Sequence, residues 1–128
     1  GSRPEELRDR TKRFALRVIV LTRSLPASED GRVIARQLLR SATSIASNYR
    51  AACRARSKAE FTAKVGVVVE EADETVFWLE LLTDSGLIAQ SRLRDLQAEA
   101  NELLAIFAAS HRTARKIKRQ WPDGPMPH

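Results

Sequence analysis

The chain has 128 residues, a length that suits a single domain with one hydrophobic core. Hydrophobic residues make up 43% of it, which argues against intrinsic disorder, and no apolar run approaches the roughly 20 residues that span a bilayer. The formal net charge of +6 favours polyanionic partners. The single cysteine, Cys53, suits a reducing compartment, so we expect a cytoplasmic protein with no membrane partner.

The charged residues are sorted into blocks along the chain. Residues 31–69 hold eight Lys/Arg and one acidic residue, whereas residues 70–102 hold two Arg and nine acidic residues. Residues 103–128 return to a basic balance, with five Lys/Arg and one Asp. The acidic block is either an ordinary solvated helix face or a patch that pairs with the basic block of another subunit.

The N-terminal segment predicts an amphipathic helix over about residues 4–24. Pro4 suits a first helical turn, and Pro26 disfavours helical geometry at the residue before it, so the helix ends there. Its core-facing residues follow heptad-like spacing: Leu7, Phe14, Val18, Leu21 and Leu25. Residues 1–3 form a tail that begins with a Gly-Ser cloning remnant.

A helix rich in small residues follows over about residues 30–54. Ser28 and Asp30 both suit its N-cap, because their side-chain oxygens can accept the free N–H groups of a first turn. Its core stripe contains Ile34, Leu38, Ala42, Ile45, Tyr49 and Ala52. The many alanines and serines allow neighbouring helices to pack closely against it.

The third predicted helix covers about residues 58–84. Ser57 and Glu60 form a capping box, in which the serine caps the first turn and the glutamate can reach back to the backbone. Gly86 ends the helix. Its core stripe contains Phe61, Val65, Val68, Ala72, Thr75, Leu79 and Leu82.

The last helix is predicted over about residues 92–119, and a proline-containing tail at residues 121–128 is expected to be flexible. No strand-like alternation occurs in the sequence. Because the connections are short, consecutive helices should be antiparallel. The sequence therefore predicts an all-α protein, one antiparallel up-down four-helix bundle over residues 4–120.

Few residues could carry enzymatic chemistry. The acidic cluster at residues 70–74 is the most enzyme-like feature, but a di-iron bundle needs Glu-x-x-His motifs on two helices. Neither His111 nor His128 follows a glutamate at that spacing, and a histidine without a partner is no active site. Cys53 suits a small packing position. We therefore predict a protein that is not an enzyme and has no metal and no cofactor.

Two basic groups could contact nucleic acid. Arg50, Arg54 and Arg56 lie on the second helix and at its end, and Arg36 and Arg40 have spacings that fit the same helix side. The last helix contributes Arg112, Arg115, Lys116 and Arg119, which share a face, together with Lys118. Contacts to phosphate would be non-specific, because no base-reading module is recognisable. The alternative is that these cations only interact with a helix dipole and solvate the surface.

The third helix also predicts a contact surface for a partner. Phe77, Trp78 and Leu81 lie off its core stripe, and one bundle cannot bury apolar residues on two sides of a helix. With the neighbouring Glu70 and Glu71 they form the predicted oligomer interface.

Two stretches resemble a known family: QLLRSATSIASNYR at residues 37–50 and RSKAEF at residues 56–61. They are similar to the four-helix bundle proteins encoded in intervening sequences of bacterial 23S ribosomal RNA genes, relatives of the accessory variability proteins of diversity-generating retroelements. The likeness covers roughly residues 12–110, and the positions that fit the family pattern are Arg40, Ser41, Ser44, Ile45, Asn48 and Glu74. Ala51, Ala52 and Glu71 depart from it, where the family often has an acidic residue, a glycine and a serine.

The resemblance implies a ring-shaped homopentamer, and in the retroelement relatives a basic surface that meets nucleic acid and a reverse transcriptase. Arg40, Ser41, Ser44, Asn48 and Glu74 would form a polar network or subunit contact, since Ser and Asn inside a helix usually need a hydrogen-bonding reason. We expect a homo-oligomer that binds RNA or DNA non-specifically, as an accessory of a ribosomal RNA intervening sequence or a retroelement. The alternative is a protein-interaction scaffold without a nucleic-acid role, with a reverse transcriptase or another protein as its client.

Overall fold

The computed structural model describes residues 3–120, with side chains as far as Lys116. This part of the chain forms four helices and no strand: α1 (Pro4–Arg23), α2 (Glu29–Cys53), α3 (Lys58–Ser85) and α4 (Gln90–Gln120). Every helix end lies within two residues of its predicted position. The predicted tails, apart from Arg3, lie outside the described residues.

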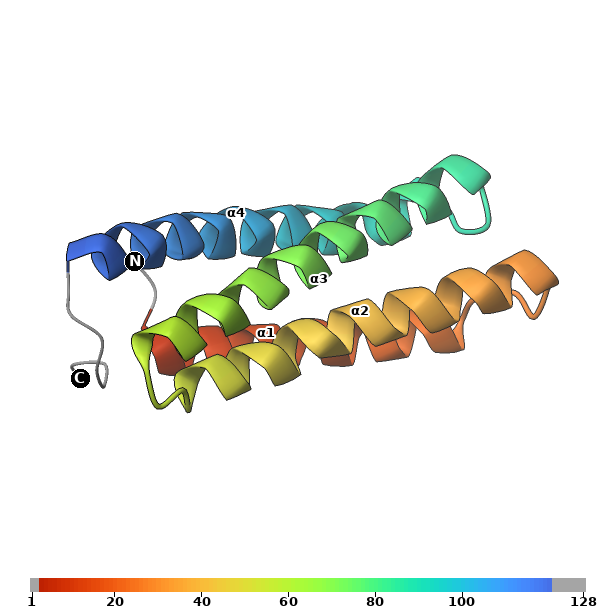
Figure 1. Ribbon diagram of the computed structural model, residues 1–128. Helices are drawn as coiled ribbons and strands as arrows, with labels where there is room; N and C mark the ends of the chain where they lie inside the picture. Colours follow the sequence, from red (N-terminus) through yellow and green to blue (C-terminus); the bar gives the residue numbers. More distant parts are fainter. Residues whose placement is uncertain (1–2, 121–128) are drawn as a thin grey trace.

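The helices form the predicted antiparallel up-down bundle, with each helix running back along the one before it (Figure 1). α3 packs extensively against both α2 and α4, whereas α1 packs on α2 and only lightly on α4. Within the described residues no Cα atom of α1 comes within 8 Å of a Cα atom of α3, so the two helices occupy diagonal corners of the bundle. The edge between α1 and α4 is therefore the most loosely packed.

The core is built from the apolar stripe of each helix. Its largest fully buried side chains include Phe14, Leu38, Ile45, Leu79, Leu103 and Phe107. The rings of Tyr49 and Phe107 meet with centroids 5.0 Å apart, which joins α2 to α4 across the bundle. Leu25 and Phe61, both predicted in core stripes, lie at the edge of the core and are half-buried. Burial of each large apolar side chain stabilises the fold by roughly 1.5–3 kcal/mol.

The helix ends follow from local capping interactions. Ser28 Oγ accepts a backbone N–H in the first turn of α2 at 3.2 Å. Ser57 Oγ accepts the N–H of Glu60 at 3.1 Å, which forms the serine half of the predicted capping box. The Glu60 carboxylate reaches back to the N–H of Arg56, one residue before the N-cap, at 3.4 Å. Gly86 ends α3 with a left-handed φ of 72°, a conformation that glycine adopts without a steric penalty.

Candidate nucleic-acid interface and polar network

The outward side of α2 is cationic. Arg36, Arg40, Arg50 and Arg54 are all exposed, so the four arginines share one side of the helix as their spacing predicts. Thr43 and Ser47 lie between the two pairs and present only small polar side chains. Arg40 is paired with carboxylates of α3, so the unpaired positive charge on this side is concentrated at Arg50 and Arg54.

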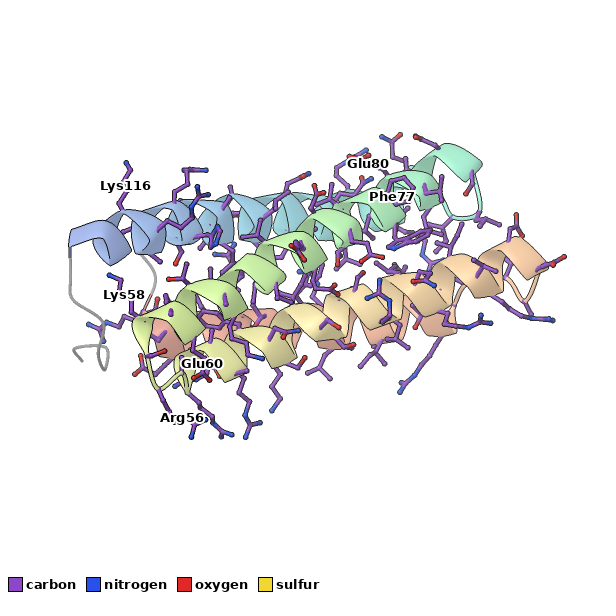
Figure 2. The ribbon with its side chains drawn as sticks, viewed as in Figure 1. Arg56, Lys58, Glu60, Phe77, Glu80 and Lys116 are labelled. Atoms are coloured by element: carbon purple, nitrogen blue, oxygen red, sulfur yellow. The ribbon has the colours of Figure 1, made fainter. Side chains whose placement is uncertain are left out.

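One end of the bundle gathers more of these cations, and we call it the basic pole. Its members are exposed side chains from the end of α2, the α2–α3 connection and α4: Arg50, Arg54, Arg56, Arg112, Arg115 and Lys116. Figure 2 shows Arg56 and Lys116 at this same end. None of the six forms an ion pair with another described residue. The side chains of Lys118 and Arg119 lie outside the described residues.

Packing between α3 and α4 fixes where the α4 cations lie. The half-buried ring of His111 lies against Gly66 of α3, and its Nε2 is 3.2 Å from where a Cβ on Gly66 would be. The last turns of α4 therefore run beside the first half of α3, which begins at the basic pole. His111, which the sequence analysis excluded as an active-site residue for want of a partner, serves here as a packing residue.

A groove of about 760 Å³ lies between α1 and α2. Four cations rim one end of it, Arg8 and Lys12 from α1 and Arg50 and Arg54 from α2, with Asp9 among them. The lining becomes apolar further along, at Ala15, Leu16, Ile19 and Ala46. Sequence reasoning did not select Arg8 and Lys12, although their spacing of four residues places them on one helix face.

Arg50 and Arg54 also line a second hollow on the other side of α2. This hollow, of about 370 Å³, is bounded on α3 by Glu60 and Lys64. The two arginines thus stand on a ridge between two depressions. Lys64 is a further cation near the basic pole that the sequence analysis did not select.

Arg40 forms the centre of the predicted polar network. Its guanidinium donates hydrogen bonds to Glu71 at 3.2 Å, to Glu74, and to Gln37 at 3.1 Å. Trp78 Nε1 also donates to Glu74, at 3.3 Å. The hydrogen bond from Arg40 is the main reason that the pKa of Glu74 lies below its usual value. These contacts hold α2 and α3 together at the surface.

The remaining predicted network residues divide into two groups. Ser41 is fully buried, and its Oγ accepts a hydrogen bond from Thr75 of α3 at 2.9 Å. Asn48 instead donates to the backbone oxygen of Ser44 in its own helix, at 2.9 Å, and does not meet Glu74. Arg40 and Ser41 therefore link α2 to α3, whereas Ser44 and Asn48 bond within α2. Thr75, predicted only as a core residue, belongs to the network.

The predicted oligomer interface is only partly free in the single chain. Glu70 and Phe77 are exposed, and half of the surface of Phe77 is accessible. Trp78 and Leu81 are half-buried and line a shallow depression with Val33 and Ile34 of α2. Glu71 is paired with Arg40.

Within the described residues, no group of three His, Cys, Asp or Glu side chains is placed to hold a metal ion. No described helix is long and apolar enough to cross a membrane. The pKa of the Tyr49 phenol is raised, mainly by burial and then by the neighbouring Cys53, which suits its place in the core.

Fold and surface together define an all-α bundle protein with a basic pole. The chain belongs to the 23S rRNA-intervening sequence protein family, whose model matches residues 5–109. The family assignment predicted from the residue 37–50 stretch is therefore confirmed. The crystal structure of a protein of unknown function from the S23 ribosomal protein family of Bacteroides thetaiotaomicron is similar, with 30% identity and a TM-score of 0.78. That match covers 85% of this chain and 97% of the other. No curated protein matches the chain.

Proposed function

We propose that this protein is a self-associating bundle without enzymatic activity that binds nucleic acid non-specifically through its basic pole. In this proposal it acts as an accessory of a ribosomal RNA intervening sequence or a retroelement. Membership of the 23S rRNA-intervening sequence protein family supports that setting.

The observation that carries the proposal is the set of exposed cations at the basic pole without ion-pair partners in the described chain. Such side chains are free to contact phosphates, and each contact releases counterions from the nucleic acid. Phosphate contacts carry no sequence information by themselves. Binding by the basic pole should therefore be salt-sensitive and tolerant of sequence.

The test is fluorescence anisotropy of labelled single-stranded RNA and duplex DNA, with the salt concentration raised stepwise. The pole variant replaces Arg112, Arg115 and Lys116 with Gln. The matched control replaces with Gln three exposed arginines near the opposite end of the bundle: Arg23, Arg32 and Arg94. Its net charge therefore falls by the same amount as that of the pole variant.

Loss of three phosphate contacts should weaken binding at moderate salt by at least roughly tenfold and reduce the salt slope by about two to three. The control should keep most of the wild-type affinity and slope. Equal loss in both variants would show a response to net charge alone and would remove the basic pole from the proposal. Absence of salt-sensitive binding by the wild type would refute nucleic-acid binding altogether.

The exposed apolar side chains favour a second function, a protein-interaction scaffold. Leu16, Val20 and Phe77 are each at least half exposed, and phosphate binding makes no use of them. A protein client, such as a reverse transcriptase, would cover such side chains. Capture of one protein from the host after nuclease treatment, combined with no RNA or DNA binding, would favour this function.

A further inference from the structure

Two exposed faces of the bundle carry opposite charges beside exposed apolar side chains. The first is the groove between α1 and α2, which we call the cationic groove. Its charged rim holds four cations, Arg8, Lys12, Arg50 and Arg54, and one carboxylate, Asp9, so it is cationic on balance. Its apolar end holds Leu16 and Ile19. Leu16 is 52% exposed, and Val20, one turn further along α1, is 62% exposed. Exposed apolar surface rimmed by polar residues is typical of an interaction site.

The second face is the outward side of α3, which we call the acidic ridge. It consists of exposed residues at helical spacing: Val67, Glu70, Asp73, Phe77, Glu80 and Asp84. Phe77 is 50% exposed, and its ring packs against that of Trp78 in a T-shaped arrangement with centroids 4.9 Å apart. Figure 2 shows Phe77 and Glu80 on α3, towards the end remote from the basic pole.

The charges of both faces have no ion-pair partner among the described residues. The four cations of the groove and the four carboxylates of the ridge form no ion pair with another described residue. Glu71 and Glu74, on the side of α3 that faces α2, are the carboxylates of this helix that Arg40 neutralises. The carboxylates of the acidic ridge are therefore available to pair with cations of another molecule.

We infer that the acidic ridge of one copy docks into the cationic groove of a second copy. The inference rests on the self-association in the proposed function and specifies which surfaces meet. Phe77 has a pair of acidic residues on each side, three to seven residues away, or about 5–10 Å along the helix. In the groove, Lys12 and Arg8 lie four and eight residues from Leu16, or about 6–12 Å. A Phe77 ring seated beside Leu16 thus brings carboxylates to the cations.

The positions of the two faces decide the symmetry of the contact. α1 and α3 occupy diagonal corners, so the groove and the ridge lie on different sides of the molecule. A twofold dimer would need both faces of one copy to meet the same partner. The contact is therefore head-to-tail, which produces a closed ring or an open filament. This contact between copies would cover two members of the basic pole, Arg50 and Arg54. The other members stay available for nucleic acid: Arg56, Arg112, Arg115 and Lys116.

The experiment uses one variant for each face. The groove variant combines Lys12→Glu with Leu16→Glu, and the ridge variant combines Phe77→Lys with Glu80→Lys. The control places two glutamates on the exposed side of α4, at Ala98 and Ala105. Light scattering after gel filtration gives the mass of each protein alone and of the two face variants mixed in equal amounts. Far-UV circular dichroism establishes that each variant is folded.

The wild type and the control should form the same oligomer, and each face variant should be a monomer. The mixture should give a dimer of one groove variant and one ridge variant, because it retains one intact groove and one intact ridge. Face variants with wild-type mass, or a mixture that stays monomeric, would overturn the head-to-tail contact while self-association stands. A monomeric wild type would overturn both, and nucleic-acid binding would still be decided separately by anisotropy.

Discussion

Arg10 and Glu99 join the first and last helices through two parallel hydrogen bonds. Arg10 Nε donates to Glu99 Oε2 and Arg10 Nη2 to Glu99 Oε1, each at 2.8 Å. Glu102 adds a second carboxylate, 3.0 Å from the same guanidinium. Because α1 otherwise packs only lightly on α4, this forked pair fixes where the two helices meet.

Replacement of Arg10 with Lys should destabilise the bundle even though the charge is kept. Lysine cannot form two parallel hydrogen bonds to one carboxylate, and both side chains of the pair are about one-fifth exposed. We expect the free energy of unfolding in urea to fall by about 1 kcal/mol. Arg13→Lys, at an exposed position of the same helix, is the control and should change little. Equal effects at the two positions would mean that the fork does not matter.

The same pair predicts a dependence of stability on pH. Arg10 is the main cause of the lowered pKa of Glu99, whose ordinary value is 4.5. A carboxylate with a lowered folded pKa stabilises the fold above its unfolded pKa, and this contribution disappears as the pH falls through the folded pKa. The stability difference between wild type and Arg10→Gln should therefore be larger at pH 7 than near pH 3. An unchanged difference at the two pH values would argue against ionic coupling.

The helix boundaries were predictable because their signals are local. Pro4 begins α1, Ser57 and Glu60 cap α3, and Gly86 ends it, all through contacts within a few residues. The core stripes were predictable for a related reason, since helical periodicity alone decides which residues share a face. Neither inference needs the relative positions of two helices.

The cross-helix contacts were harder to predict, because they depend on how far one helix is shifted along its neighbour. The family resemblance already grouped Arg40 with Glu74, but only the packing shows that Arg40 also pairs with Glu71 and that Asn48 does not join them. The same holds for Arg8, which lines the cationic groove opposite Arg50. The sequence therefore identified the types of residue in the candidate sites, and the packing decided their partners.

Replacement of Gly31 or Gly86 with alanine should lower the stability of the fold by very different amounts. A Cβ on Gly31 would lie 2.3 Å from the backbone oxygen of Pro26, so Gly31→Ala must displace the α1–α2 turn. A Cβ on Gly86 would meet nothing within 4 Å, so Gly86→Ala would meet only the strain of its positive φ. We expect a loss of about 1 kcal/mol for Gly86→Ala and clearly more for Gly31→Ala. Thermal unfolding of both variants checks this order, and a reversed order would contradict the close approach at Pro26.

The buried hydrogen bond between Thr75 and Ser41 can be measured by a double-mutant cycle. Thr75→Val removes the donor and keeps the shape of the side chain, and Ser41→Ala removes the acceptor. Ser41 also donates to the backbone oxygen of Leu38 at 3.2 Å, so Thr75→Val leaves Ser41 with one partner. Each single variant should lose about 1 kcal/mol of unfolding free energy, and the double variant should lose less than the sum by about 0.5–1.5 kcal/mol. Additive losses would mean that the two hydroxyls act independently, each through the backbone of its own helix.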